Sequence, residues 1–271
     1  MTTEPKRYST ENPLRILSLG WGVQSWTLAA MAALDEIPKP VFAVHADTTH
    51  EMEATYTHAA KWTPWLEEHG VKVVTVQNPK PEVIREDWAG GILMPAYAKQ
   101  HETGELGIAR RQCTNHWKIQ PIRQFIRTHI GKPRPASVEM QMGISLDEWH
   151  RMKDADVKYI KNVYPLVDQR ISRKDCITWL EQHGLDVPTK SGCVFCPYNT
   201  IARWKQIKSQ GGVDWIEAVD ADEKIRHARP GYDYFVHKKA IPLEEAVRIP
   251  EDYGAKQIEM DIPCDSGHCF V

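Results

Sequence analysis

The sequence predicts an α/β protein in which a parallel sheet is flanked by helices. Three apolar, strand-like runs, at residues 14–19, 40–46 and 71–76, alternate with helix-compatible stretches at 23–34 and 52–69. This alternation is typical of parallel strands joined by crossover helices. The chain has 271 residues, of which 42% are hydrophobic, so it can bury a sizeable core.

The middle of the chain is less regular. Residues 79–112 lose their periodicity and contain several glycines, which predicts an irregular active-site loop or lid. A helix is expected at residues 114–130 despite Pro121, and a further strand at 138–144. We therefore expect the sheet to continue beyond residue 140.

Two later segments predict helices. Ser145 and Glu148 have the spacing of a capping box, in which each residue bonds the backbone of the other at a helix start. Residues 173–183 form a helical pattern, and more helical sequence with Trp204 follows. We expect Trp149 and Trp204 to belong to the core, because tryptophans at helical spacing usually do.

Charge and composition narrow the cellular setting. The 34 basic and 36 acidic side chains nearly cancel, so no overall field recruits nucleic acid, although a local basic patch would. Residues 1–13 resemble neither a signal peptide nor a membrane span, so we expect a cytoplasmic protein without a membrane partner. In that compartment the six cysteines are expected to be thiols or metal ligands.

The turn after the first predicted strand has the features of an anion site. It lies where a strand passes into a helix, so backbone N–H groups and the positive helix end converge there. Glycine would allow close approach and positive φ. An ordinary tight turn is the alternative. The candidate ligand-binding residues of this turn are Ser18, Gly20, Trp21, Gly22, Val23, Gln24 and Ser25.

This turn resembles the pyrophosphatase loop, or PP-loop, of the adenine-nucleotide α-hydrolase superfamily, whose usual form is Ser-Gly-Gly-x-Asp-Ser. Gly22 and Ser25 keep that spacing, whereas Gln24 stands where the family has Asp. Loops of the form Gly-x-Gly-Val-Gln-Ser occur among phage and bacterial homologues of phosphoadenosine-phosphosulfate reductase. The resemblance implies a Rossmann-like fold that binds ATP, with Mg²⁺ neutralising the phosphates.

Two further segments resemble the same superfamily. Asp47, Thr48 and Glu51 match the Asp-Thr-Gly-x-x-x-Glu region that follows the second strand, although a helix cap is the alternative for Asp47. Gly143 and Arg151 match a later Gly-Ile-x-x-x-Glu-x-x-Arg stretch that lies beside the nucleotide. Arg151 would then pair with phosphate, the alternative being a solvated helix residue.

The cysteines predict metal or thiol chemistry. Cys193 and Cys196 place two soft ligands on one turn, as zinc and iron–sulfur sites do. Cys113 lies in a segment that resembles the Cys-Cys-x-x-Arg-Lys-x-x-Pro element of adenylylsulfate reductases, with Gln112 in place of the first cysteine. The resemblance implies a three-cysteine [4Fe–4S] cluster, as in tRNA thiolation enzymes. The alternatives are a redox-active pair or a zinc site; the zinc ligands would be Cys193, Cys196, Cys264 and Cys269.

The candidate catalytic thiols are Cys193 and two cysteines near the end of the sequence. Cys264 and Cys269 lie in a polar segment, where His268 is a cationic neighbour able to favour the thiolate. Sulfonucleotide reductases carry a nucleophilic cysteine in such a tail. Around Cys113, basic residues at helical spacing suggest an anion-binding channel or a solvated helix face; they are Arg110, Arg111, Lys118, Arg123 and Arg127.

Together these resemblances imply an ATP pyrophosphatase that adenylates a substrate for sulfur transfer. We expect the substrate to be nucleic acid, in DNA phosphorothioation or tRNA thiolation, with a cysteine desulfurase as the sulfur donor. The alternatives are a thiol-dependent reductase of adenylylsulfate or phosphoadenylylsulfate, and a non-catalytic nucleotide-binding subunit. The expected domains are a nucleotide-binding PP-loop domain at 1–165 and a helical, cysteine-bearing region at 166–271.

Overall fold

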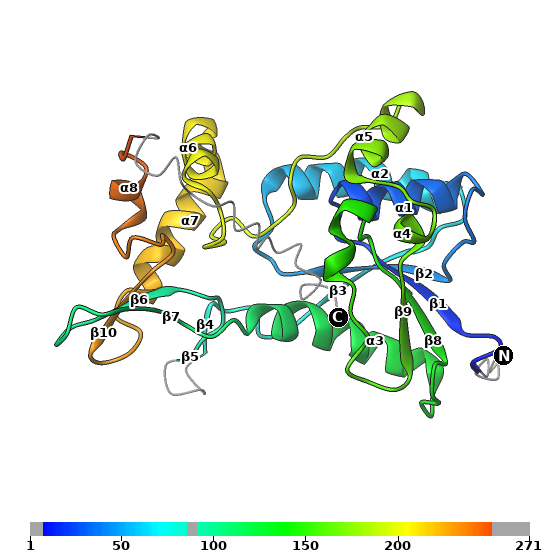
Figure 1. Cartoon of the computed structure of the whole chain (residues 1–271), viewed down its shortest axis with the longest axis horizontal. Coiled ribbons are helices and arrows are strands. Elements are labelled where there is room, and N and C mark those ends of the chain that lie inside the picture. Colours follow the sequence, from blue (N-terminus) through cyan, green and yellow to red (C-terminus); the bar gives the residue numbers. More distant parts are fainter. Residues whose placement is uncertain (1–7, 86–90, 251–271) are drawn as a thin grey trace.

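A five-stranded parallel sheet forms the centre of the protein (Figure 1). The computed structural model describes residues 8–85 and 91–250. The strand order is β3-β2-β1-β8-β9, and every neighbouring pair is parallel, which confirms the predicted fold class. The strands are β1 (Leu14–Ser18), β2 (Phe42–Asp47), β3 (Val73–Gln77), β8 (Val138–Gln141) and β9 (Ile160–Val163).

Alternating side chains attach helices to both faces of this sheet. Leu17 and Ala43 share one core with helices α1, α2 and α5, whereas Ile16 and Val44 share another with α3. Every residue of α1 is buried, because α2, α4 and α5 all pack around it. The helices are α1 (Val23–Ala33), α2 (Glu53–Glu68), α3 (Gln120–Ile130), α4 (Pro165–Asp168) and α5 (Arg173–Gln182).

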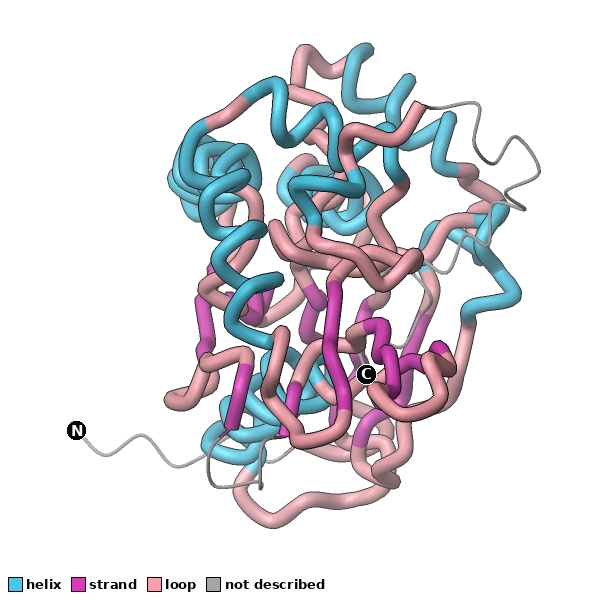
Figure 2. The backbone as a smooth tube through the Cα atoms, turned by 90° about the vertical axis from the view of Figure 1, so that its left-hand side faces the viewer, coloured by secondary structure: helices cyan, strands magenta, loops and turns pink. Residues whose placement is uncertain are grey.

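A second group of elements lies beside the sheet, in the left half of Figure 1. After a 90° turn, its helices lie above and most strands below (Figure 2). Three strands pair antiparallel in the order β10-β6-β7. The elements are β4 (Ile84–Arg85), β5 (Gly91–Ile92), β6 (Tyr97–Gln100), β7 (Leu106–Ile108), α6 (Ile201–Gln210), α7 (Gly212–Ile225), β10 (Tyr232–Phe235) and α8 (Leu243–Ala246).

The prediction of an irregular loop at residues 79–112 was therefore wrong. This segment carries four short strands, and β6 pairs with β10, which is far away in the sequence. Strand β9 was also missed, because it is a short edge strand whose outward Lys161 weakens the apolar pattern. Strand β8 ends at Gln141, earlier than expected.

The predicted helix starts had mixed outcomes. The helix at residues 114–130 is confirmed, with a π-helical first part, Thr114–Ile119, and Pro121 in the first turn of α3. The capping box at Ser145 was wrong, because that side chain caps nothing and a kinked 3₁₀-helix, Leu146–Arg151, follows. Trp204 is buried as expected, but Trp149 is 64% exposed, which corrects its placement in the core.

The apolar cores cross the predicted domain boundary at residue 165. Cys176 and Leu180 of α5 pack against Trp26 of α1, so α5 belongs with the parallel sheet. Leu93, from the segment before the boundary, packs with Trp204 of α6. The apolar cores are therefore not separated at residue 165. No helix in the described ranges combines the length and apolar character needed to span a bilayer.

Candidate functional site

A pocket lies at the carboxyl ends of β1 and β8. The chain extends the sheet in one direction from β1 and in the other from β8, and parallel sheets bind ligands at such a switch point. We call it the loop pocket. It is lined by Ser18, Gly22, Gln24, Ser25, Gly143, Arg151 and Ser191.

The amino end of α1 supplies the anion-binding character of this pocket. Its N-cap, Gly22, makes no side-chain cap, and the first turn contains no acidic residue, so the first backbone N–H groups lack an intrahelical partner. The Ser25 hydroxyl accepts from the Gly20 N–H at 3.2 Å and donates to the Gly22 carbonyl at 3.3 Å. The loop is therefore closed on itself, and Gln24 and Ser25, in the first turn of α1, line the pocket.

The strained residue of the loop is Trp21. Its φ is 56°, whereas Gly22 has φ −82°, so Trp21 takes the positive φ that a glycine was expected to allow in this turn. The Trp21 side chain is 1% exposed and packs against Trp26 and edge-on to His58. This burial offsets a backbone cost of order 1–3 kcal/mol. The Trp21 side chain thus anchors the loop in the core, and only its backbone is available to a ligand.

Two glycines permit close backbone approach. A Cβ on Gly143 would lie 2.7 Å from the Ser25 nitrogen, which cannot move without the helix. A Cβ on Gly22 would lie 2.8 Å from the Ser191 hydroxyl. The turns after β1 and β8 therefore touch through Gly143, and Ser191, which precedes the cysteines, contacts the loop at Gly22.

A polar network holds Arg151 at the wall of the loop pocket. Gln24 donates to Glu148 at 3.0 Å and accepts from Arg173 at 2.6 Å, and Arg151 donates to Glu148 at 2.5 Å. The Arg151 side chain is 6% exposed, so the alternative of a solvated helix residue was wrong. Its Nε has no hydrogen-bond partner among the described residues. A buried, incompletely satisfied guanidinium in this wall fits an anionic ligand.

Asp47, Thr48 and Glu51 lie outside the lining of the loop pocket. The Asp47 carboxylate accepts from the Thr49 N–H at 2.7 Å and from the Tyr56 hydroxyl at 2.8 Å. Burial, together with this hydrogen bond, raises the pKa of Tyr56. Helix α2 has Met52 as its N-cap, so the alternative of Asp47 as a helix cap was wrong. Nucleotide binding by Asp47, Thr48 and Glu51 stays a prediction.

Thr48 instead connects a buried ion pair to a thiol. The Glu51 carboxylate is 2% exposed and pairs with the Lys118 ammonium at 3.2 Å. The Thr48 hydroxyl lies 3.3 Å from the Glu51 carboxylate and 3.5 Å from the Cys193 sulfur. Cys193 is therefore held in place by a hydroxyl that is itself positioned by buried charges.

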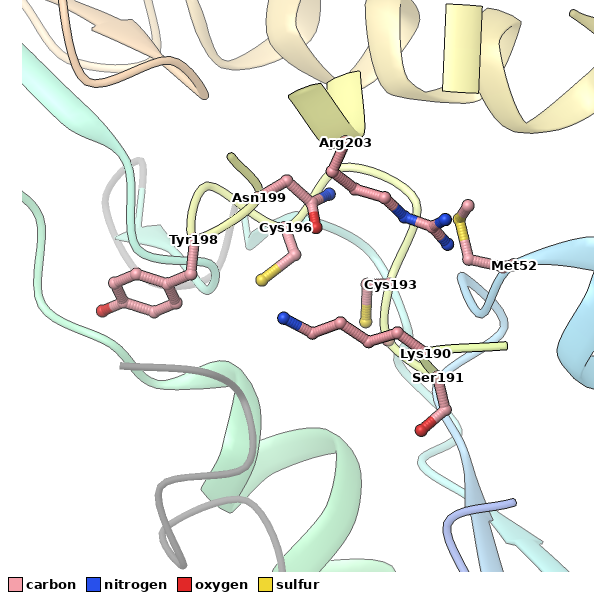
Figure 3. Close-up of a pocket in the computed structure, with 9 residues that line it drawn as sticks. Met52, Lys190, Ser191, Cys193, Cys196, Tyr198, Asn199 and Arg203 are labelled. Carbon is pink, nitrogen blue, oxygen red and sulfur yellow. The ribbon is translucent and has the colours of Figure 1, made fainter. Parts of the chain in front are cut away.

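Cys193 and Cys196 line a second pocket, which we call the thiol pocket (Figure 3). Val194 donates to the His50 carbonyl at 2.8 Å, which fixes the cysteine turn beside the end of β2. Ser191 lines both pockets, so they adjoin. The lining residues are Met52, Lys190, Ser191, Gly192, Cys193, Cys196, Tyr198, Asn199 and Arg203.

Cys113 approaches the same region. Burial raises the pKa of Tyr198, and negative charge on Cys196 or Cys113 acts in the same direction. However, no three His, Cys, Asp or Glu side chains within residues 8–85 and 91–250 are arranged to hold a metal ion. The three thiols therefore do not fit a cluster in this arrangement, and the [4Fe–4S] cluster stays a prediction.

The remaining cysteine predictions have separate outcomes. Cys264, Cys269 and the neighbouring His268 lie outside the described residues, so the zinc alternative and the catalytic tail stay predictions. Cys176 is fully buried, and burial raises its pKa to about 11, so it serves the core.

The basic residues near Cys113 do not face one channel. Lys118 is paired with Glu51, and Arg123 is paired with Asp156. Arg111 lies over the Tyr198 ring. The predicted anion-binding channel at this helix was therefore wrong for Lys118 and Arg123, because carboxylates distant in sequence neutralise them.

Sequence reasoning missed the cations of the thiol pocket. Lys190 and Arg203 belong to no motif, and only the folded chain places them with Cys193 and Cys196. A signal was present in the Pro188–Gly192 stretch, because a turn-forming segment that carries Lys and Ser before two cysteines is typical of a binding loop.

Known proteins similar to this chain were found among solved structures. No protein-family model and no curated protein matches the sequence. One similar solved structure is phosphoadenylyl-sulfate (PAPS) reductase from Candida auris in a phosphate complex, at 12% identity and TM-score 0.42, with 67% of this chain and 81% of that chain covered. Another is the U34-tRNA thiolase NcsA from Methanococcus maripaludis with its [4Fe-4S] cluster, at 17% identity and TM-score 0.39, with 88% and 70% covered. At these values neither similarity assigns an activity to this chain.

Proposed function

We propose that this protein is an ATP pyrophosphatase that adenylates a nucleic-acid substrate and then transfers sulfur to it. The observation that carries the proposal is the loop pocket, where the uncapped amino end of α1 meets the buried Arg151. Gly143 and Gly22 bring the surrounding backbone close enough to enclose phosphate oxygens. The neighbouring thiol pocket supplies the sulfur chemistry.

In the first step, an oxygen of the substrate attacks the α-phosphorus of ATP. A bond forms between that oxygen and phosphorus, and the bond to the β-phosphate oxygen breaks as pyrophosphate leaves. The N–H groups of α1 and the Arg151 guanidinium would stabilise the charge that develops on the phosphate oxygens. Gln24 is neutral, so the negative charge that holds Arg151 comes from Glu148.

In the second step, sulfur replaces the activated oxygen. A persulfide on Cys193, formed by a cysteine desulfurase, attacks the adenylated atom, and AMP leaves with the electrons of the broken bond. Cys196 then attacks the inner sulfur, which releases the thiolated product and leaves a Cys193–Cys196 disulfide. A thiol reductant would restore the pair. The sulfur acceptor is DNA backbone phosphate or a tRNA base.

Mg²⁺ and the cluster remain part of the proposal only as expectations. Mg²⁺ would neutralise the phosphates, and Glu148 is the carboxylate that holds Gln24 and Arg151 beside the loop pocket. The thiols of Cys113, Cys193 and Cys196 do not fit a [4Fe–4S] cluster in their present arrangement, and the two proposed steps do not use one. Iron, sulfide and zinc analysis after anaerobic purification tests for a cluster, because stoichiometric zinc without iron would exclude it.

The decisive experiment measures ATP binding and pyrophosphate release with Arg151→Gln. We expect ATP affinity to fall about 10- to 100-fold, because a hydrogen bond to a charged group contributes about 1.5–3 kcal/mol. Arg134→Gln, at an exposed position before β8, is the matched control and should change nothing. Unchanged ATP affinity in Arg151→Gln would contradict the proposal.

Two other results would redirect it. Sulfite release from adenylylsulfate or phosphoadenylylsulfate with reduced thioredoxin, without pyrophosphate release, would instead indicate a thiol-dependent reductase. Firm ATP binding without pyrophosphate release, across DNA, tRNA and a cysteine desulfurase, would indicate a non-catalytic nucleotide-binding subunit.

A further inference from the structure

We propose that the thiol pocket is a second anion site. It binds a phosphate or sulfate ester group of the sulfur acceptor through Lys190, Arg203 and the amino end of α6. The inference deepens the proposed function, on which it rests, by naming the chemical group that the second substrate presents. Neither Lys190 nor Arg203 belongs to a motif, and neither contributes to the loop pocket.

The first observation is the charge of the pocket. Its described lining contains two cationic side chains, Lys190 and Arg203, and no carboxylate. Figure 3 shows Lys190 extended across the pocket, with its ammonium at the end where Cys196 lies. Burial lowers the pKa of Arg203, and Asp214 opposes that shift without lining the pocket. Arg203 is half-buried and Lys190 is exposed, and a pocket with two cations and no carboxylate in its described lining favours an anionic ligand over a neutral one.

The second observation is the start of α6. Tyr198 and Asn199 lie directly before the N-cap Thr200, so the first turn of this ten-residue helix borders the pocket. Thr200 accepts from the Arg203 N–H at 3.2 Å, and the first turn contains no acidic residue. The positive end of the helix therefore adds to the two cations.

The third observation is the position of the thiol relative to both pockets. Thr48 fixes the Cys193 sulfur through a contact of 3.5 Å, and Ser191, two residues earlier, belongs to both pockets. An ester oxyanion held by Lys190 and Arg203 would therefore bring the acceptor next to Cys193 and across Ser191 from the phosphates of ATP. Cys193 would meet the group that the loop pocket activates.

The test compares the alkylation of Cys193 by a negative and a neutral reagent in the full-length, reduced protein. Iodoacetate and iodoacetamide both transfer their carbon to the thiolate as the C–I bond breaks and iodide leaves. The ratio of their rates cancels changes in thiolate fraction and reports attraction of the anion. Peptide mass spectrometry assigns the modification to Cys193 or Cys196.

We expect the iodoacetate-to-iodoacetamide ratio at Cys193 to fall about fivefold in Lys190→Gln and in Arg203→Gln, because one charge at about 4 Å in water contributes about that factor. Lys190→Arg should keep the ratio. The matched control is Lys174→Gln, on the exposed side of α5, which should also keep it. Inorganic phosphate should slow iodoacetate labelling of the wild type more than iodoacetamide labelling.

Protection experiments identify the source of the ester. A DNA or tRNA oligonucleotide that protects Cys193 in the wild type, but not in Lys190→Gln, would assign the site to a nucleic-acid phosphate. Protection by adenylylsulfate alone would assign it to a sulfonucleotide. An equal ratio in wild type and both variants, without protection by phosphate, would overturn the anion site. ATP-dependent pyrophosphate release in that same protein would leave the proposed function standing, because alkylation requires no nucleotide.

Discussion

The loop pocket and the thiol pocket share Ser191 but are built in different ways. The loop pocket lies where the turns after the neighbouring strands β1 and β8 meet, and its charged wall, Arg151, belongs to a hydrogen-bonded network with Glu148. The thiol pocket consists of side chains from one turn and the start of α6, fixed to the end of β2 by a few contacts. The loop pocket is therefore rigid, whereas the positions of the side chains in the thiol pocket depend on ion pairs and turns outside it.

The difference predicts how substitutions act in the two regions. In the loop pocket, the missing Cβ of Gly143 and the buried Trp21 leave no space for adjustment. Beside the thiol pocket, the positions of side chains depend on electrostatic pairing, above all between Glu51 and Lys118. Substitutions that change packing should therefore disrupt the loop pocket, and substitutions that change charge should disrupt the thiol pocket.

The largest effect is expected from Lys118→Met, which tests the charged support of the thiol pocket. It leaves the buried Glu51 carboxylate without its cation and should reduce the free energy of unfolding by about 3–5 kcal/mol. Urea denaturation measures the loss, and the double variant Lys118→Met with Glu51→Gln should recover most of it. A loss below about 1 kcal/mol would show that water screens the pair as it does at a surface.

A smaller effect is expected from Gly143→Ala, which tests the rigidity of the loop pocket. The new Cβ would lie 2.7 Å from the Ser25 nitrogen, so we expect a loss of about 1–3 kcal/mol in unfolding free energy and weaker ATP binding. Gly107→Ala is the control, because no heavy atom lies within 4 Å of the position that a Cβ would take there. Equal stability of both variants would mean that the turns after β1 and β8 can move apart.

The smallest effect is a pH dependence that arises from two buried histidines, His58 and His237. Burial lowers the pKa of His58, beneath Trp21, and of His237 from 6.5 to about 4. A lowered histidine pKa contributes stability that is complete above pH 6.5 and is lost as pH falls towards 4. At pH 5.5 each histidine should lower the free energy of unfolding by about 1.4 kcal/mol relative to its value above pH 6.5. In thermal unfolding measured across pH, His58→Gln and His237→Gln should each reduce the pH dependence of stability by that histidine's contribution. An unchanged slope in His58→Gln would mean that folding does not lower the pKa of His58.

The elements that were predictable are those whose signal is local. Residues 14–76 alternate between apolar runs and helical patterns, so β1, α1, β2, α2 and β3 were all expected. Strand β6 was not, because its pairing with β10 joins segments more than a hundred residues apart. Ser145 looked like a cap, but the Glu148 that would complete the box bonds Gln24 and Arg151 instead.

The sequence alone determined the α/β class and the place of the turn that we propose as the anion site, because both follow from patterns within a few residues of one another. The burial of Arg151, the contact between Gly143 and Ser25, and the union of Lys190, Arg203 and Cys193 in one pocket were decided by the tertiary structure. These features depend on which distant segments the sheet and its helices bring together, and no local pattern encodes such contacts.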